Sequence, residues 1–386
     1  MKKVSILGST GSVGRQTLEI IDNFPQDFQI IGLAAGNNVR LLKDQIIKFK
    51  PQAVSINNPN AKKEIESFLK SNNQKAEVVC SNEGLKIIAS LPDNDILVVA
   101  TEGTVSILPT FQAIKNGTTI ALACKEVLVS AGKTIMESAQ KYGAKILPVD
   151  SEHAAIKQCL SGIGENTKLV NSIILTASGG PFWTTGKEDF SKITVRKALA
   201  HPKWNMGPKI SIDSATFMNK GLEVIEAHHL FNIDFDRIKV IVHPQSIVHS
   251  IVEFKDGTQL AQLSAPDMRF PIQYALTYPD KVDNPWPKLD LSNLKELQFF
   301  NPDPKRFPLL DLAYDIGKKG GTYPVVMNAS NEAIVNLFLN EKISFTEIPD
   351  LVEKYIASFS HFADPTIDEI IAIDSNIKEK IYNDYK

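Results

Sequence analysis

The sequence predicts an α/β protein in three parts: a doubly wound parallel sheet, a central α+β part with a mostly antiparallel sheet and a lid loop, and a small helical part. Two observations carry this prediction. Short apolar runs alternate with helical patterns up to about residue 150, and alternating polar and apolar runs followed by helices come after it. We therefore expect domains at residues 1–149, 150–285 and 286–386, with the lid at 179–208.

Seven short apolar runs mark the strands of the first domain. They lie at residues 4–7, 29–34, 53–56, 78–80, 96–100, 119–123 and 145–149. Helical patterns alternate with them, and this order produces a parallel sheet with helices on both faces.

The second and third domains follow from a change of pattern. A strand, a Pro-, Gly- and Trp-rich loop and a long helical stretch are expected at residues 172–176, 179–208 and 213–231. Alternating runs at residues 239–242, 247–254 and 258–264 predict an antiparallel sheet. Lys255-Asp256-Gly257 supplies a hairpin turn between the last two runs. Helical patterns after a proline-rich connector predict a small helical unit at residues 309–318, 325–339, 348–360 and 367–385.

Composition restricts the classes of partner. Lys plus Arg total 42 against 44 for Asp plus Glu, and this balance argues against nucleic acid or an anionic membrane as a partner. Three cysteines without CxxC spacing predict neither a disulfide framework nor a thiolate zinc site. No apolar run approaches the roughly 18 residues of a membrane helix, and the N-terminus enters a strand pattern at once. We expect a cytoplasmic protein that binds a small molecule.

A glycine-rich loop follows the first strand. The segment GSTGSVG, residues 8–14, lies between that strand and a helical run at residues 15–24. Glycines allow the backbone to approach a pyrophosphate, and the helix N-terminus offers unpaired N–H groups to the anion. The spacing is GxxGxxG rather than GxGxxG, so a tight turn without a ligand is the alternative. The loop favours a Rossmann-like, dinucleotide-binding domain.

The end of the second strand favours NADPH over NADH. An acidic residue at this place would bind the ribose 2′-hydroxyl of NADH and repel a 2′-phosphate. The segment here is AGNNVR, which contains Asn37, Asn38 and Arg40 but no carboxylate. Thr10 and Ser12 add hydroxyl donors nearby. Arg40 as an ordinary exposed helix residue is the alternative interpretation, so the NADPH prediction depends on the missing acid.

One face of the expected helix at residues 213–231 is polar. Helical spacing places Asn219, Lys220 and Glu223 together, and Ser214 stands at the predicted start of the helix. A carboxamide, an ammonium, a carboxylate and a hydroxyl suit a phosphorylated polyol. A solvated Lys220–Glu223 pair would explain the charges but not Asn219.

Three carboxylates form the candidate metal site. Asp150 and Glu152 end the seventh strand-like run, and alternation along an extended segment would point them the same way. Solvated or helix-capping carboxylates are the alternative. With Glu223 they would make an all-oxygen site, which suits Mg²⁺ or Mn²⁺ rather than zinc.

The segment at residues 179–208 has the composition of a lid. Glycines and prolines stand at both ends, so the segment can close over a substrate and exclude water. Trp204 and Met206 would supply apolar cover, and His201 would contact a phosphate or hydroxyl. Trp204 packed in the domain core is the alternative.

Six motifs together resemble one family, 1-deoxy-D-xylulose 5-phosphate reductoisomerase, the NADPH enzyme of the non-mevalonate isoprenoid pathway. They are GSTGSVG, ALACKE, PVDSEH, TASGGPF, HPKWNMG and SIDSATFMNKGLEVIEA. They occur in family order from residue 8 to 227, and Asn328-Ala329-Ser330-Asn331-Glu332 also fits, so the resemblance covers essentially the whole chain.

The resemblance implies a role for each matching residue. The expected metal ligands are Asp150, Glu152 and Glu223. These three residues and Lys125 are also the expected catalytic residues. The expected NADPH contacts are Thr10, Gly11, Ser12, Val13, Gly36, Asn37, Asn38, Cys124, Glu126 and Gly207. The expected substrate contacts are Lys125, Ser151, Glu152, Ser178, His201, Trp204, Met206, Ser214, Asn219, Lys220 and Glu223, with Ser178, His201, Ser214 and Asn219 around the phosphate.

Two departures from the family pattern affect the cofactor side. The family often has a basic residue at the position of Asn37 and an Asn at that of Cys124. The resemblance further implies a homodimer and a retro-aldol and aldol rearrangement. The rearranged aldehyde would then be reduced by NADPH to 2-C-methyl-D-erythritol 4-phosphate.

Two rival functions stay open at this stage. Cys124 follows the sixth strand, where a semialdehyde or acyl-phosphate dehydrogenase can place its nucleophile. Such an enzyme would need no metal. A dinucleotide-sensing regulator would bind NADPH without turnover, and it would leave the three carboxylates unexplained.

Overall fold

The computed structural model describes residues 1–204 and 206–386, and the chain divides into two compact units. Unit 1 comprises Met1–Val127, Lys133–Ala154 and Asp267–Trp286, and unit 2 comprises Leu128–Gly132, Ala155–Pro266 and Pro287–Lys386. Two helices, α6 (Glu126–Tyr142) and α7 (Ser151–Ser161), contribute residues to both units. The division into three domains remains a prediction. Within the described residues, no helix has both the length and the apolar character needed to cross a bilayer.

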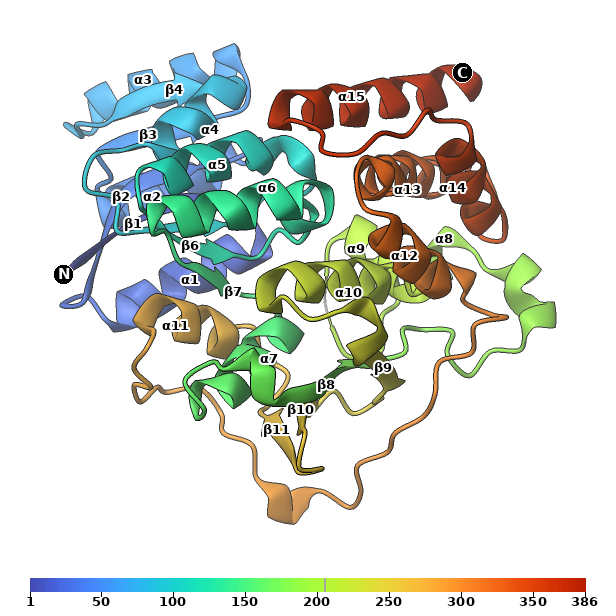
Figure 1. The fold of residues 1–386 in the computed structure, drawn as a ribbon. Helices are drawn as coiled ribbons and strands as arrows, with labels where there is room; N and C mark the ends of the chain where they lie inside the picture. Colours follow the sequence, from blue (N-terminus) through green and yellow to red (C-terminus); the bar gives the residue numbers. More distant parts are fainter. Residues whose placement is uncertain (205) are drawn as a thin grey trace. The chain divides into compact units, whose positions relative to one another are not determined.

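Unit 1 is built on a sheet of seven strands in the order β4-β3-β2-β1-β5-β6-β7 (Figure 1). The strands are β1 (Lys2–Leu7), β2 (Phe28–Ala34), β3 (Ala53–Ile56), β4 (Glu77–Cys80), β5 (Ile96–Val99), β6 (Thr119–Leu122) and β7 (Ile146–Pro148). Every pairing in this sheet is parallel. The predicted Rossmann-like sheet is therefore confirmed.

Helices cover both faces of this sheet because side chains alternate along each strand. Val4 and Ile6 of β1 point into a core shared with α1 (Ser12–Asn23), α2 (Val39–Phe49), α3 (Pro59–Ser71) and α11 (Arg269–Thr277). On the other face lie α4 (Ser81–Ala89) and α5 (Ile107–Lys115). A Cβ on Gly32 of β2 would come within 3.0 Å of Ile88 of α4. Helix α11 was not predicted, although Pro271 lies in its first turn, where proline is tolerated.

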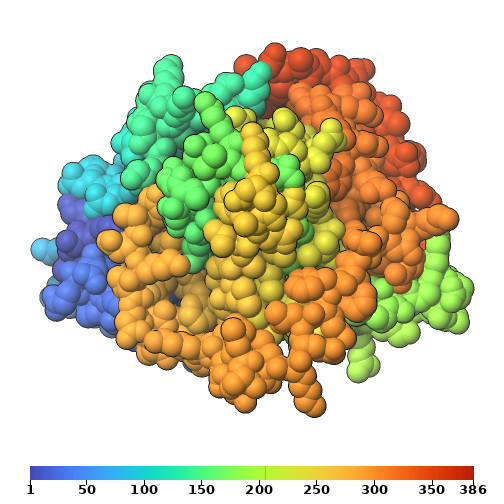
Figure 2. All heavy atoms as spheres, turned by 60° about the horizontal axis from the view of Figure 1, so that its bottom comes forward, coloured from blue at the N-terminus to red at the C-terminus, as the bar shows by residue number. Residues whose placement is uncertain are grey.

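Unit 2 contains a mixed sheet of four strands in the order β11-β10-β8-β9. The strands are β8 (Val170–Ala177), β9 (Ile238–Val242), β10 (Val248–Phe254) and β11 (Gln259–Leu263). β10 pairs antiparallel with β8 and β11, and β8 pairs parallel with β9, so the prediction of a mostly antiparallel sheet is confirmed. The predicted hairpin turn also forms, with Gly257 at φ +87°. Strand β11 lies at an edge of the sheet and on the surface (Figure 2).

The predicted helix at residues 213–231 is two helices, α9 (Pro208–Thr216) and α10 (Met218–Phe231). Phe217 separates them with a left-handed φ of 63°, and its buried ring packs on Phe307 at 4.4 Å between centroids. The prediction of one continuous helix was wrong because a tertiary contact holds this break. The four predicted C-terminal helices are confirmed as α12 (Pro308–Lys319), α13 (Tyr323–Leu339), α14 (Glu347–Ala357) and α15 (Ile367–Asp384) (Figure 1).

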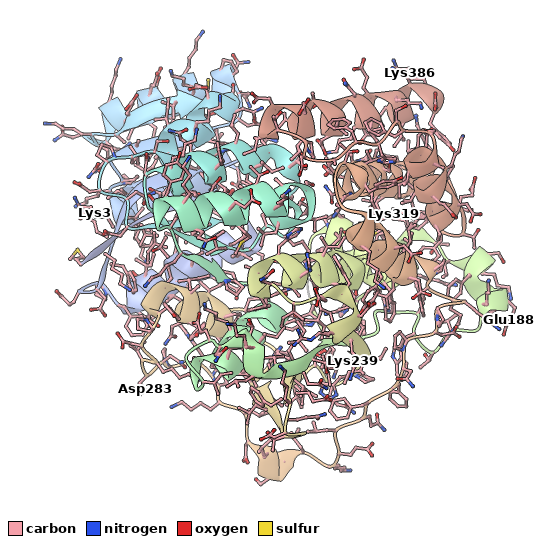
Figure 3. All side chains as sticks on the ribbon, in the orientation of Figure 1. Lys3, Glu188, Lys239, Asp283, Lys319 and Lys386 are labelled. Carbon is pink, nitrogen blue, oxygen red and sulfur yellow. The ribbon has the colours of Figure 1, made fainter. Side chains whose placement is uncertain are left out.

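The segment expected to form the lid contains regular structure. It holds a 3-10 helix, η3 (Lys187–Lys192), and the short helix α8 (Val195–Leu199). Phe190 of η3 is buried and packs against Phe307 and Phe345 with centroids 5.8 and 5.9 Å away. Glu188 of the same turn points into solvent (Figure 3). Asn205 in this segment lies outside the described residues.

Candidate active site

The glycine-rich loop forms a close turn between β1 and α1. Gly8 has φ +89°, and a Cβ there would lie 2.3 Å from the Ala100 carbonyl oxygen. A Cβ on Gly14 would lie 2.2 Å from the Gly8 carbonyl oxygen, so the start of α1 needs glycine to approach the loop. The N-cap residue of α1 is Gly11, which has no side chain to accept a hydrogen bond from the first N–H groups of the helix. The first N–H groups of α1 are therefore available to an anion, which fits the phosphates of a dinucleotide.

The two predicted cofactor segments lie at one edge of the sheet. The N–H groups of Gly8 and Ser9 both donate to the carbonyl of Ala34, at 2.9 and 2.8 Å. This ties the loop that carries Thr10, Gly11, Ser12 and Val13 to the end of β2, which Gly36, Asn37 and Asn38 follow. The Oδ1 of Asn38 accepts from the N–H of Leu41 at 3.1 Å and caps α2, so the side chain has a structural role as well.

An ion pair follows β6 and β7. Lys125, at the N-terminus of α6, places its Nζ 2.6 Å from Oδ2 of Asp150. Burial by itself would raise the pKa of Asp150, but the charge of Lys125 and the nearby His153 hold that pKa well below its ordinary value. His153 Nδ1 lies 3.9 Å from Asp150 Oδ1. Asp150 is therefore a carboxylate at neutral pH, in the state that a metal ion requires.

Glu152 does not continue the strand. Helix α7 begins at Ser151, and Ser151 Oγ donates to Glu152 Oε2 at 2.6 Å. Asp150 and Glu152 therefore do not alternate along an extended segment as predicted, because β7 already ends at Pro148. The two carboxylates still stand two residues apart at the carboxyl end of β7. They are the oxygen donors that Mg²⁺ and Mn²⁺ prefer.

The geometry argues against Cys124 as a nucleophile. Its side chain is 2% exposed. Its S–H group donates to the Gly103 carbonyl at 3.2 Å and to the Glu126 carboxylate at 3.4 Å. A neighbouring carboxylate disfavours the thiolate, which is the reactive form of cysteine. The predicted cofactor contact Glu126 is thus engaged with Cys124 at the start of α6.

In unit 2, Ser178 and His201 contact each other. Ser178 Oγ lies 2.9 Å from His201 Nε2. His201 Nδ1 accepts the N–H groups of Lys203 and Trp204, at 3.2 and 3.0 Å, so the proton of the neutral ring resides on Nε2. Desolvation lowers the pKa of His201 to about 4. His201 therefore donates to Ser178, whose own hydroxyl proton remains for an acceptor such as phosphate.

Ser214 packs against the loop that carries Ser178. A Cβ on Gly180 would lie 2.6 Å from the Ser214 carbonyl oxygen, so glycine is required where the two segments meet. Ser214 lies in the last turn of α9, not at the start of a helix as predicted. Trp204, Met206 and Gly207, which precede α9, are partly buried.

The polar face predicted on α10 forms as a hydrogen-bonded cluster. Asn219 Nδ2 donates to Glu223 Oε1, and Lys220 Nζ donates to Glu223 Oε2. Lys220 is 4% and Glu223 is 1% exposed, so the cluster is buried rather than a solvated helix face. The buried Glu223 carboxylate offers oxygens of the kind that Mg²⁺ and Mn²⁺ prefer.

Three polar residues near Ser214 were given no role at the site from the sequence. Asp213 is 1% exposed, and its Oδ2 lies 2.7 Å from Lys209 Nζ. Asn331 of α13 donates to Asp213 Oδ1 at 2.8 Å. The i, i+4 spacing of Lys209 and Asp213 was visible in the sequence, but the partner on α13 was not.

A cavity of about 730 Å³ in unit 1 is unrelated to these residues. Its lining includes Lys2, Asn94, Thr119 and Lys145. These residues stand at or near the amino ends of the strands, at the opposite edge of the sheet from the glycine-rich loop.

Comparisons with known proteins identify the family. The family model described as 1-deoxy-D-xylulose 5-phosphate reductoisomerase matches residues 4–132, and two models of C-terminal domains of that enzyme match residues 146–231 and 263–380. The reductoisomerase of Thermoanaerobacter pseudethanolicus is 50% identical over 386 residues, with 100% of both chains covered. The chain belongs to the 1-deoxy-D-xylulose 5-phosphate reductoisomerase family. The reductoisomerase of Chloroherpeton thalassium is 49% identical, with 99% of this chain and 98% of that chain covered.

Solved structures of reductoisomerases have the same fold. The Zymomonas mobilis enzyme in complex with NADPH is 39% identical, with a TM-score of 0.92 and coverage of 100% of this chain and 99% of that chain. A reductoisomerase in complex with NADPH, fosmidomycin and magnesium is 36% identical, with a TM-score of 0.94 and coverage of 99% and 98%. The resemblance found in the sequence is thereby confirmed over the whole chain.

Proposed function

We propose that the residues described above let this chain convert 1-deoxy-D-xylulose 5-phosphate to 2-C-methyl-D-erythritol 4-phosphate. As a member of the reductoisomerase family, the chain is an enzyme that depends on NADPH and a divalent metal ion. The assignment of work to residues is the proposal. One observation carries it: the Lys125–Asp150 ion pair stands at the carboxyl edge of the sheet that also holds the glycine-rich loop.

The metal ligands in this proposal are Asp150, Glu152 and Glu223. Each carboxylate has a neighbour suited to keeping it oriented: Lys125 for Asp150, Ser151 for Glu152, and Asn219 with Lys220 for Glu223. A bound Mg²⁺ or Mn²⁺ would act as Lewis acid and template for the ketone and adjacent hydroxyl of the substrate, while NADPH would supply hydride. Lys125 would add a positive charge beside these oxygens.

The phosphate of the substrate would be held by Ser178, His201, Ser214 and Asn219. The Ser178 hydroxyl can donate because His201 Nε2 already donates to it. Lys220 would add a positive charge to this group. Contacts to a remote phosphate supply binding energy that closes and orients an active site.

The cover of the site would come from Trp204 and Met206. Phe190 anchors the middle of the longer segment in a buried aromatic cluster, so closure would involve the part near α9. Closure would exclude water while the carbon skeleton rearranges.

The direct test is NADPH oxidation with 1-deoxy-D-xylulose 5-phosphate, with Mn²⁺ and with a chelator. We expect turnover that requires both the substrate and the metal. Full activity in chelator that is lost in Cys124→Ser would instead support a dehydrogenase with a cysteine nucleophile. NADPH binding without turnover of any kind would support a regulator.

We also propose a homodimer in the cytoplasm. The three cysteines are free thiols, which suits a reducing compartment. Strand β11 is a sheet edge with Gln259, Leu260 and Ala261 exposed, and an open edge can pair with a second copy.

A further inference from the structure

A buried polar cluster joins α9 to α13 within unit 2. Asp213 of α9 accepts from Asn331 of α13 at 2.8 Å and pairs with Lys209 at 2.7 Å. Asp213 is 1% exposed and Asn331 is 0% exposed. The proposed cofactor, metal and substrate contacts include none of these three residues.

A buried polar cluster joins two helices at a large desolvation cost. Burial strips water from the charged groups, and a well-packed apolar contact of similar size is often as stable or more stable. The best-attested benefit of a buried polar cluster is that it selects one arrangement, because a shifted arrangement would leave a charge without its partner. The cluster therefore sets how α9 is rotated and placed on α13.

Rotation of α9 decides where Ser214 points. Successive residues on an α-helix are about 100° apart, so fixing Asp213 toward α13 fixes the direction of the next side chain. The backbone of Ser214 packs closely against Gly180. A Cβ at Gly180 would lie 2.6 Å from the Ser214 carbonyl oxygen. Two contacts from different parts of unit 2 thus define the position of Ser214.

The cluster continues toward the end of the chain. Glu332, next to Asn331, pairs with Lys378 of α15 at 2.9 Å, and Lys378 also pairs with Asp374 at 2.9 Å. Burial raises the pKa of Glu332, and the charges of Lys378 and Lys209 act against that rise. Lys209 is therefore close enough to influence both Asp213 and Glu332.

We infer that Asp213, Asn331 and Lys209 are positioning residues for the phosphate of the substrate. They orient Ser214 without touching the substrate, and the C-terminal helices thereby contribute to substrate affinity. The inference rests on the proposed function, because it assumes that Ser214 binds that phosphate.

The test compares two leucine substitutions on α13. In Asn331→Leu the hydrogen bond to Asp213 is lost while a side chain of similar volume remains. Asn328→Leu is the matched control, because Asn328 is also 0% exposed and its amide has no hydrogen-bond partner among the described residues. We expect Asn331→Leu to raise the KM for 1-deoxy-D-xylulose 5-phosphate about tenfold. The KM for NADPH should change less than about twofold in both variants.

A direct binding measurement separates positioning from folding. Competitive inhibition by inorganic phosphate should weaken in Asn331→Leu in parallel with the substrate KM, and it should stay unchanged in Asn328→Leu. In Asn331→Asp two carboxylates would face each other, and the double variant Asp213→Asn, Asn331→Asp restores an amide–carboxylate pair. We expect this double variant to recover part of the substrate affinity lost in Asn331→Asp, because it restores the amide–carboxylate pair but lacks the Lys209–Asp213 ion pair.

Three outcomes with these variants would overturn the inference. Equal changes of substrate KM in the two leucine variants would show a general packing effect. A lower melting temperature with an unchanged KM in Asn331→Leu would show a structural role alone. Absence of recovery in the double variant would show that the pairing is not what matters. Turnover by the unmodified enzyme tests the proposed function separately, and an inactive enzyme would refute that function and the inference that rests on it.

Discussion

Single residues around the proposed site owe their chemical state to their neighbours. The charge of Lys125 keeps Asp150 ionised although burial opposes it. Backbone N–H groups fix the tautomer of His201, which in turn frees the proton of Ser178. Glu223 accepts from Asn219 and Lys220 on its own helix. Asp150 and His201 are therefore held in the protonation states that the proposed function requires before any ligand binds.

Glu223→Gln tests the metal assignment. The substitution removes one negative charge and keeps the size of the side chain, so we expect kcat to fall roughly a hundredfold to a thousandfold. Mn²⁺ affinity should fall as well, whereas NADPH affinity should stay within about twofold, because the glycine-rich loop is unaltered. Steady-state kinetics and titrations with Mn²⁺ and NADPH measure the three quantities. Near-normal turnover would refute the ligand assignment.

His201 should titrate far below an ordinary histidine. Its pKa of about 4 in the folded chain lies below the ordinary value of 6.5 because of desolvation. The stability linked to this shift is present above pH 6.5 and is lost as the pH falls toward 4. NMR titration of the imidazole, assigned with His201→Asn, checks the value, and a midpoint near 6.5 would contradict the buried neutral ring. Urea unfolding of His201→Asn should depend less on pH across the same range.

At the scale of elements, the strands and the C-terminal helices were predictable and the joints between elements were not. Runs of apolar residues located β1 and α13, because most residues of each element are buried. The break at Phe217 has no such signal, since contact with Phe307 holds its left-handed backbone. Glu152 was assigned to a strand because the sequence likewise carries no signal for the boundary between two elements. Strand β7 ends at Pro148 and helix α7 begins at Ser151, only a few residues later.

The close packing of α10 on α12 gives a prediction at this scale. A Cβ on Gly221 would lie 2.5 Å from the Cβ of Ala313, so Gly221→Ala should push the helices apart. We expect the free energy of unfolding to fall by about 1–3 kcal/mol. Gly162→Ala is the control, because nothing lies within 4 Å of a Cβ at that position. Urea denaturation compares the two, and equal stability would show that the helices adjust freely.

At the scale of the whole molecule, each unit is built from segments that are separated along the chain. Unit 1 includes residues 267–286, which follow the strands of the unit 2 sheet along the chain, and α11 packs there against α1. Such a return has no local signal in the sequence. It requires the core of unit 1 to be assembled from segments far apart in the chain.

The open edge of β11 leads to a prediction about assembly. Leu260 of this edge strand is 48% exposed, and Leu260→Lys would place a charge there, a common means of blocking edge pairing. If the proposed homodimer uses this edge, light scattering should report a monomer at micromolar concentration for this variant. Leu169→Lys, at a position with 47% exposure, should remain dimeric. A dimer in both variants would place the interface elsewhere.

The sequence by itself determined the parallel sheet, the glycine-rich loop, the mostly antiparallel sheet and the residue types of the site. These features depend on local periodicity and on motifs of a few residues, which are readable along one chain. Tertiary structure alone decided the tautomer of His201, the break at Phe217 and the contact of Asn331 with Asp213. Each depends on a partner distant in sequence or on one local turn, and no periodic pattern records such a partner.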